Sequence, residues 1–173
     1  MATPFHVELV TPERVLFAGE ADEVSMRTVE GEITFLARHE DYIGVADVTV
    51  VRIGFSGGTA DDGTEREPSE TRAAVHGGFV HVGRDGVVIL AGVAELASEI
   101  DVARARAALQ AAEARRDAGA EPTARRVETP DSEATPERPT PEAALALALS
   151  DSPEAAIRRA KVRLEAAGAT ASA

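Results

Sequence analysis

The residues best suited to chemistry in this sequence are charged side chains on two Ala-rich segments. Arg159 and Arg163 are four residues apart, so on a helix their guanidinium groups project from one face and can converge on phosphate oxygens. Arg104, on the earlier segment, can add a third guanidinium from a facing helix. Asp101 and Glu95 stand close to it in sequence and can accept hydrogen bonds or orient the arginines. This set of residues predicts a site for an anionic ligand.

A purely structural role explains the same residues equally well. An Asp just before a helix caps the free N–H groups of the first turn and interacts favourably with the helix dipole. The three arginines then lie on solvated helix faces or pair within their own helices, with Glu99 and Glu165 as partners. The residue pattern leaves both interpretations open.

Catalytic and metal-binding patterns are not found in the sequence. There is no Ser/His/Asp or Cys/His set, no phosphate-binding P-loop and no Gly-rich phosphate loop after a strand. Cysteine is absent, which excludes disulfides and thiolate metal sites. The histidines form no closely spaced metal-binding pair, and we expect ordinary surface or loop histidines at positions 6, 39, 76 and 81. We therefore expect no catalytic residue, no metal site and no enzyme.

The charge of the chain excludes two classes of partner. The 30 Asp and Glu residues against 18 Lys and Arg give a formal net charge of -12. A general nucleic-acid-binding protein needs a basic surface, and anionic lipid attracts basic segments. No apolar stretch approaches the roughly 20 residues that span a bilayer, and the first residues lack a signal-peptide pattern. We expect a soluble intracellular protein that contacts a membrane only through a partner.

Residues 1–98 carry the pattern of a β-sandwich domain. Apolar and polar residues alternate in short runs, as in half-buried strands, and turn signals recur about every 8–12 residues. Residues 79–90 form the clearest hairpin. Residues 54–69 are polar, Gly-rich and acidic, and we expect them to form a long exposed loop between two strands.

Residues 99–173 carry the pattern of a C-terminal helical region. Apolar residues at helical spacing predict helices at 101–118 and 153–167, joined by a Pro- and Glu-rich linker at 119–152. The fold class is therefore an all-β N-terminal sandwich or barrel of about ten short strands, followed by a C-terminal antiparallel α-helical hairpin. The apolar stripes are mostly Ala, which buries little area. We expect weak packing and a hairpin that can detach and dock elsewhere.

This arrangement resembles one family, the epsilon subunit of bacterial F-type ATP synthase. The order and spacing of several motifs carry the resemblance: FHVELVTPERVLFAGEADEVSMRTVEGEI (5–33), HGGFVHV (76–82) and VVILAGVAELASEIDVARA (87–105). It covers residues 3–117 and about 153–167. Three departures are visible: Ala37 and Arg38 stand where the family usually has Pro and Gly, and both the 54–69 loop and the interhelical linker are longer than usual.

The resemblance implies a rotor part of the central stalk that couples proton flow to ATP synthesis. The sandwich would bind the gamma subunit and the c-ring, on the cytoplasmic face of the bacterial cell membrane, as a peripheral protein. The C-terminal helices would extend into the alpha/beta catalytic head and inhibit ATP hydrolysis. The alternative is a free-standing β-sandwich adaptor module with a disordered acidic tail. The family's c-ring contact falls on the turns around residues 30–40, at Glu30, Gly31, Glu32, His39 and Glu40.

The resemblance also implies ATP as a regulatory ligand, with no cofactor required. Some bacterial members bind ATP in the folded hairpin through the motif I/L-D-x-x-R-A. The motif is intact here, and its companion acid and two arginines are present, so the candidate site is Glu95, Ile100, Asp101, Arg104, Ala105, Arg159 and Arg163. A further arginine of that site falls on Ala111 and is missing, which predicts weak binding.

Overall fold

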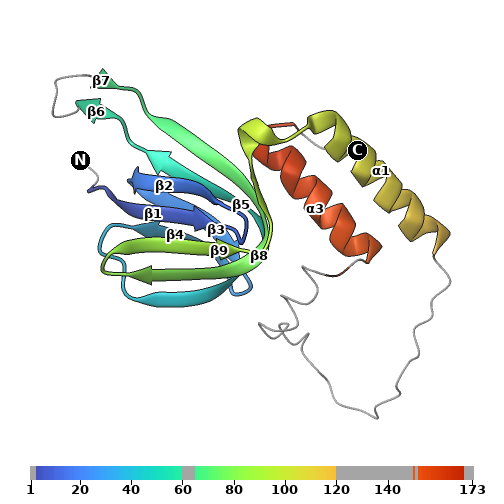
Figure 1. The fold of residues 1–173 in the computed structure, drawn as a ribbon, viewed down its shortest axis with the longest axis horizontal. Coiled ribbons are helices and arrows are strands. Elements are labelled where there is room, and N and C mark those ends of the chain that lie inside the picture. The colour runs from blue at the N-terminus through green and yellow to red at the C-terminus, as the bar shows by residue number, and fades with distance from the viewer. Residues whose placement is uncertain (1–2, 60–64, 120–149, 151, 170–173) are drawn as a thin grey trace, which may run out of the picture.

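Strands fill the first part of the chain and helices the second, in the computed structural model of the protein (Figure 1). It describes residues 3–59, 65–119, 150 and 152–169. The linker expected at 119–152 lies almost wholly outside these residues. In the described part ten strands precede a 3₁₀ turn and two α-helices: β1 Phe5–Val10, β2 Val15–Ala21, β3 Glu23–Thr28, β4 Gly31–Leu36, β5 Tyr42–Phe55, β6 Gly58–Thr59, β7 Glu65–Arg66, β8 Ser69–Gly83, β9 Gly86–Ala91, β10 Ala94–Leu96, η1 Ala97–Glu99, α1 Val102–Ala118 and α3 Pro153–Ala166.

Eight of the strands form one hydrogen-bonded sheet that folds over on itself. The strand order is β2-β1-β9-β8-β5-β3-β4, with β10 added to β8. Neighbours are antiparallel except for β1 and β9, which run parallel. One apolar core draws side chains from both halves of the sheet, and its largest fully buried members are Leu9, Val24, Phe35, Ile53, Val80 and Ile89. The expected β-sandwich is confirmed.

The segment expected as a long loop at 54–69 is shorter and more regular than expected. β5 runs through Gly54 and Phe55, which pair with Glu70 and Ser69 of β8. Beyond them Gly58–Thr59 pairs with Glu65–Arg66, so β6 and β7 continue the hairpin as a narrow ribbon at its tip (Figure 1). The expected bounds were wrong because the ladder between two long strands extends into a segment whose composition alone favours a loop.

Two glycines change which face of β8 points inward. Val75 lies in the sandwich core, and so does Val80, five residues later; in a regular strand those positions would face opposite sides. Gly77 and Gly78 lie between them with φ of 89° and 153°, conformations that other residues rarely adopt. A Cβ on Gly78 would also lie 2.2 Å from the carbonyl oxygen of Leu90. The break therefore leaves His76 on the outer face of the sheet.

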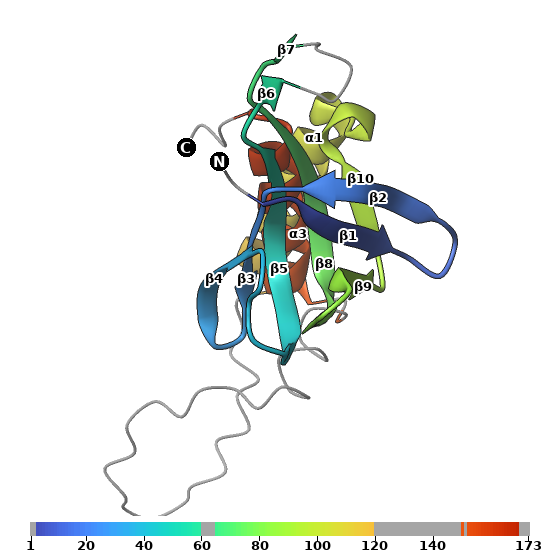
Figure 2. The same cartoon turned by 90° about the vertical axis from the view of Figure 1, so that its left-hand side faces the viewer.

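The two helices form an antiparallel hairpin of which only one helix packs on the sheet. α3 contacts β5 and β8, whereas α1 contacts mainly α3; in Figure 2 α3 lies directly behind these two strands. Ser152 caps α3, because its hydroxyl accepts the N–H of Ala155, and Pro153 follows at the first position, which suits proline. Among the described residues no helix is both long and apolar enough to cross a membrane.

Candidate functional site

The two helices are joined along a narrow apolar stripe. Ala105, Leu109 and Ala112 of α1 meet Ile157, Ala160 and Leu164 of α3, and all six are buried. Because half of these residues are alanines, the stripe buries little apolar area for its length. A second small cluster joins the hairpin to the outer face of the sheet, and its buried members are Val50, Ala74, Ile100 and Ala166.

A small cleft opens where α1 leaves the sandwich, between its first turns, β10 and α3. Its volume is about 60 Å³, well below the roughly 300–1,000 Å³ of typical small-molecule pockets. Five of the residues expected at the anion site line it: Glu95, Asp101, Arg104, Ala105 and Arg163. Glu99 and Ala108 complete the lining; the sequence reasoning did not place either at the site.

Glu95 and Arg163 form the tightest ion pair of the cleft. Oε1 of Glu95 accepts hydrogen bonds from Nε and Nη2 of Arg163 at 2.6 and 2.5 Å. Both side chains are about three-quarters buried, so water competes less for this pair than for an exposed one. The guanidinium that would bind a phosphate therefore already holds a carboxylate of the same chain.

The remaining candidate residues have structural contacts. Asp101 caps α1, since its Oδ1 accepts the backbone N–H of Arg104 at 3.0 Å. Ile100 is buried beneath α3. Arg159 does not line the cleft; its Nη1 donates to the carbonyl oxygen of Ser150 at 2.8 Å. The structure therefore brings Arg104 and Arg163 to one cleft and directs Arg159 elsewhere.

Glu99, at the rim of the cleft, ties the start of the hairpin to the sandwich. Its Oε2 accepts a hydrogen bond from Nη2 of Arg14 at 2.5 Å. Arg14 lies in the turn between β1 and β2. The guanidinium of Arg14 holds the pKa of Glu99 below its usual value. The sequence analysis proposed only partners within the helices for Glu99, and this contact spans 85 positions of sequence.

His76 is the most deeply buried titratable group near the cleft, and the expectation that it lies at the surface was wrong. Its exposed fraction is 1%, because the break at Gly77 leaves it on the sheet face that α3 covers. Its Nε2 lies 3.8 Å from Oε1 of Glu95. Among the described residues neither ring nitrogen has a hydrogen-bond partner. Burial first, and then the charge of Arg163, lower the pKa of His76 to about 4.

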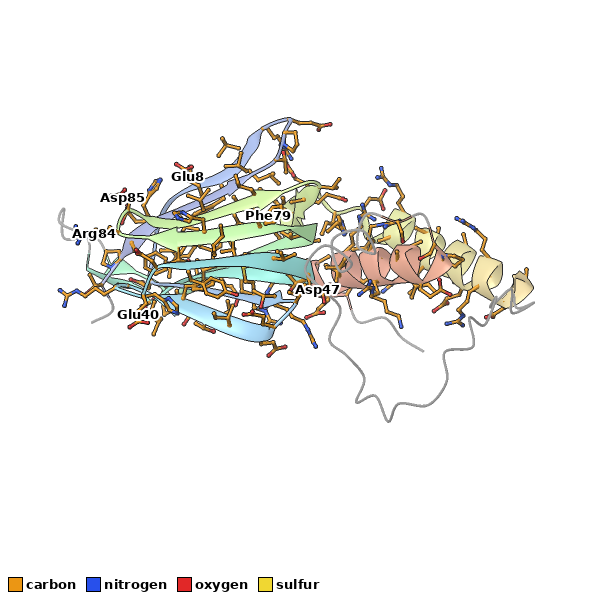
Figure 3. All side chains as sticks on the ribbon, turned by 90° about the horizontal axis from the view of Figure 1, so that it is seen from below. Glu8, Glu40, Asp47, Phe79, Arg84 and Asp85 are labelled. Carbon is orange, nitrogen blue, oxygen red and sulfur yellow. The ribbon has the colours of Figure 1, made fainter. Side chains whose placement is uncertain are left out.

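Two further ion pairs join α3 to the sheet at a distance from the cleft. Arg52 of β5 contacts Glu165 at 3.3 Å, and Arg158 contacts Asp47 at 3.7 Å. Figure 3 shows Asp47 beside α3. One of the interpretations left open by the sequence gave Glu165 a partner within its own helix, and the structure pairs it with Arg52 of β5 instead. Such exposed pairs contribute only about 0–1 kcal/mol each.

The residues expected at the c-ring contact lie along the β4 edge of the sandwich. Glu30, Glu32 and Glu40 are exposed, and Gly31 begins β4 with φ of 138°. The ring of His39 packs edge-on against Phe35, with 5.1 Å between centroids, and its Nδ1 donates to the carbonyl oxygen of Glu40. The hydroxyl of Tyr42 lies 3.5 Å from the carboxylate of Glu30. These contacts hold the β3–β4 turn and the β4–β5 loop against one another.

An exposed apolar surface covers the outer face of β5, β8 and β9, beyond the part that α3 covers. Ile43, Phe79 and Leu90 are 74%, 45% and 50% exposed. Phe79 is paired with Leu90 and with Val45, and Ile43 with His81. We call the exposed side chains of Ile43, Phe79 and Leu90 the outer apolar face. The sequence analysis did not identify it, although apolar residues on both faces of one strand are a signal of it.

The outer apolar face continues into a broad groove at the end of the sandwich away from the hairpin. The groove has a volume of about 670 Å³ and is lined by residues of β1, β5, β8 and β9, among them Glu8, Ile43 and His81, and by Arg84 and Asp85 of the turn between β8 and β9. Figure 3 shows Arg84, Asp85 and Glu40 at this end. A hydrogen bond to Glu8 raises the pKa of His6, which lines the same groove. Nowhere in the described part of the chain do three potential metal ligands gather.

Comparison with known proteins assigns the sandwich to a family. Residues 4–97 match the family described as ATP synthase, Delta/Epsilon chain, beta-sandwich domain. The ATP synthase epsilon chain of Thermobifida fusca (strain YX) is 53% identical over 109 residues, 62% of this chain and 73% of that protein. The epsilon chain of Streptomyces griseus subsp. griseus is 41% identical over 121 residues, 70% of this chain and 90% of its own length.

One solved structure extends the likeness in fold to nearly the whole chain. A chain in the cryo-EM structure of the Euglena gracilis mitochondrial ATP synthase, OSCP/F1/c-ring in rotational state 1, matches 95% of this chain and 81% of its own length. The TM-score is 0.59 and the identity is 22%. At that identity the likeness is one of fold.

Proposed function

The chain belongs to the family of ATP synthase delta and epsilon chains, and from this we propose that it is the epsilon subunit of an F-type ATP synthase. It is a non-catalytic subunit that forms part of the central stalk. The observation that carries the proposal is the family match over residues 4–97, together with relatives named ATP synthase epsilon chain that are 41–53% identical. In this role the subunit couples proton flow to ATP synthesis.

The gamma subunit docks on the outer apolar face. Monomeric proteins rarely leave contiguous apolar surface of this kind uncovered, and interfaces are built around such patches. The exposed side chains of Ile43, Phe79 and Leu90 lie on neighbouring strands, so one partner surface can cover all three. The adjoining groove is lined by both apolar and charged side chains, among the latter Glu8, Asp41 and Asp85, and such charged groups suit the rim of the same interface.

The c-ring contacts the acidic edge formed by Glu30, Glu32 and Glu40. The contact places the subunit on the cytoplasmic face of the membrane as a peripheral protein, with the c-ring between it and the lipid. The chain has no cysteine, so a single cysteine introduced at any of these positions is the only site for a sulfhydryl cross-linker. Cross-links from all three positions to the c subunit support the contact, and their absence in an assembled complex contradicts it.

The helical hairpin inhibits ATP hydrolysis when it leaves the sandwich and extends toward the alpha/beta head. This proposal is supported by the small apolar contacts that hold the two helices together and dock the hairpin on the sheet. ATP is the regulatory ligand of the docked state and binds between Arg104 and Arg163. Because the cleft is small and Arg163 is paired with Glu95, ATP must displace that carboxylate and widen the cleft, and binding is weak.

A pull-down from detergent-solubilised membranes tests the assembly. The tagged chain is expected to bring down gamma and the c-ring, with one copy of the chain per complex. Phe79→Asp places a charge at the centre of the outer apolar face and is expected to abolish recovery of gamma. Val15→Asp is the matched control, since Val15 is also exposed, at 57%, but lies on β2, outside that face. A folded chain that recovers no ATP synthase subunit would contradict the proposal and favour the alternative, a free-standing β-sandwich adaptor module.

A further inference from the structure

His76 occupies a position in which a neutral ring fits and a charged one does not. The outer face of β8 is covered by α3 at this point, and the ring is 1% exposed. A buried nitrogen without a hydrogen-bond partner costs free energy even when the ring is neutral, and a charged ring without a partner costs far more. Both ring nitrogens lack a partner among the described residues.

The charges around the ring come from three elements. α3 contributes Arg159 and Arg163, both of which disfavour a second positive charge beside them. β10 contributes Glu95, whose Oε1 lies 3.8 Å from the ring but is already bonded twice to Arg163. β5 contributes Asp47, in an ion pair with Arg158 of α3. Three of these five charges, Arg158, Arg159 and Arg163, belong to the helix that covers the ring and leave with it.

We propose that His76 is a proton-sensitive latch between the sandwich and the helical hairpin, such that its protonation releases α3 from the sheet. The covered ring accepts a proton only when α3 moves away, because release admits water and removes both arginines. α1 leaves with α3, since it packs on α3 and hardly on the sheet. The latch itself does not depend on the proposed function. Only its consequence does, which is that an inhibitory hairpin is released at low pH.

The direction of the effect follows from the two protonation equilibria. In the docked hairpin the pKa of His76 is lowered to about 4, and the ordinary value is 6.5. A released His76 therefore binds a proton in a pH range where a docked one does not. His76 leaves the free energy of docking unchanged above pH 6.5. Docking becomes less favourable as the pH falls below that value, and the effect of His76 reaches its maximum below pH 4. Between pH 7 and pH 5 the ratio of released to docked hairpin rises about twentyfold.

Single-molecule energy transfer on the isolated full-length chain tests the latch. Dyes on cysteines introduced at Arg84, at the far end of the sandwich, and at the exposed Lys161 of α3 report the distance between the two parts. The ratio of released to docked hairpin is expected to rise between pH 7 and pH 5 by the factor given above. This range lies above the ordinary pKa of Asp and Glu, about 4, so carboxylate protonation adds little. A ratio of released to docked hairpin that is the same at pH 5 as at pH 7, measured at a urea concentration where both states are populated, would overturn the proposal.

Two variants at His76 and one matched control show whether the pH response comes from the His76 ring. His76→Gln and His76→Leu remove the titration with a polar and an apolar side chain, and either one that folds is expected to respond to pH at least fivefold less than the unmodified chain. His81→Gln changes an exposed histidine of the same strand and is expected to keep the full response. Equal responses in all chains would overturn the proposal.

Direct titration of the His76 ring by NMR provides a test that needs no His76 variant. Because protonation is linked to release, the ring in the full chain is expected to titrate with a midpoint between the docked value of about 4 and the ordinary value of 6.5, and a midpoint at 6.5 would overturn the latch. All of these experiments use the isolated chain, so their failure leaves the rotor assignment intact. Conversely, a hairpin that docks with this pH dependence but does not inhibit hydrolysis in the assembled enzyme would contradict only the proposed function.

Discussion

At the residue scale, the turn between β4 and β5 contains a residue in an unfavourable conformation. Arg38 has φ of 63° and is the one non-glycine residue with positive φ in the described part of the chain. It sits in a turn closed by the N–H of His39 and the carbonyl of Leu36, at the position that favours glycine in a type II turn. The resemblance to the epsilon family gives Pro-Gly as the usual pair here, which suits that turn without strain.

We predict that Arg38→Gly stabilises the fold. Relieving the left-handed conformation gains about 1–2 kcal/mol, and the greater freedom of glycine in the unfolded chain takes back about 0.4–1 kcal/mol, so the free energy of unfolding rises by about 0.5–1 kcal/mol. Urea unfolding of the sandwich measures this change in the free energy of unfolding. Ala37→Gly is the neighbouring control and is expected to lower the stability by a similar amount, because Ala37 has no positive φ to relieve and only the unfolded chain gains. A loss of stability in Arg38→Gly would contradict the account.

The pairing of Arg163 with Glu95 makes a prediction for ATP binding. Arg163→Gln removes a guanidinium from the cleft and is expected to abolish binding in calorimetry at millimolar ATP. Glu95→Gln breaks the same ion pair but frees Arg163, so it is expected to retain binding. Arg106→Gln, on an exposed position of α1 outside the cleft, is the neutral control. Loss of binding in both cleft variants would mean that the ion pair, by holding the hairpin down, matters more than the free guanidinium.

What the sequence predicts at this scale depends on whether the contacts are local. The cap at Asp101 follows from its position before an Ala-rich helix, and the structure has it. The environment of His76 depends on a break at Gly77 and on a helix more than seventy residues later, and neither is visible in the strand pattern around it. The partners of Glu99 and Glu165 were missed for the same reason, because both lie far away in sequence.

At the scale of elements, α3 rather than α1 determines whether the hairpin stays docked. α3 packs on α1 with one face and on β5 and β8 with the other, so it is buried on two sides. The sequence predicts both helices from their caps and spacing, but their Ala-rich stripes do not indicate which one faces the sheet. The β5–β8 hairpin was harder to predict, since its Gly-rich tip favours a loop while its ladder continues to Phe55 and Ser69.

Leu164 is the largest fully buried side chain of the hairpin, so we predict that Leu164→Ala unfolds α1 and α3 while leaving the sandwich folded. Leu-to-Ala changes in cores cost about 2–5 kcal/mol, which is large against a stripe otherwise made mostly of alanines. Hydrogen exchange is expected to accelerate in both helices and to stay slow in β1, β5 and β9. Lys161→Ala, at an exposed position of the same helix, is expected to change neither. Equal acceleration in the sandwich would mean that the two parts unfold together.

At the scale of the whole molecule, the chain consists of two separate cores joined by a small contact. The sandwich core draws no residue from the hairpin, and the stripe between the helices draws none from the sandwich. Between them lie one four-residue cluster, the buried pair of Arg163 with Glu95, and ion pairs at the surface. A domain held in this way can leave without unfolding its neighbour, and the outer apolar face, which we propose as the docking surface for gamma, stays exposed in both states.

This separation of cores predicts the effect of removing the hairpin. A chain that lacks residues 100–173 keeps every member of the sandwich core and the outer apolar face, so it is expected to assemble with gamma and the c-ring as the full chain does. The assembled enzyme is then expected to hydrolyse ATP faster, because the element that we propose enters the catalytic head is gone. Comparing hydrolysis by the two complexes at equal epsilon content measures this. Equal rates would show that the hairpin does not inhibit in this enzyme, whereas failure to assemble would show that the hairpin takes part in docking.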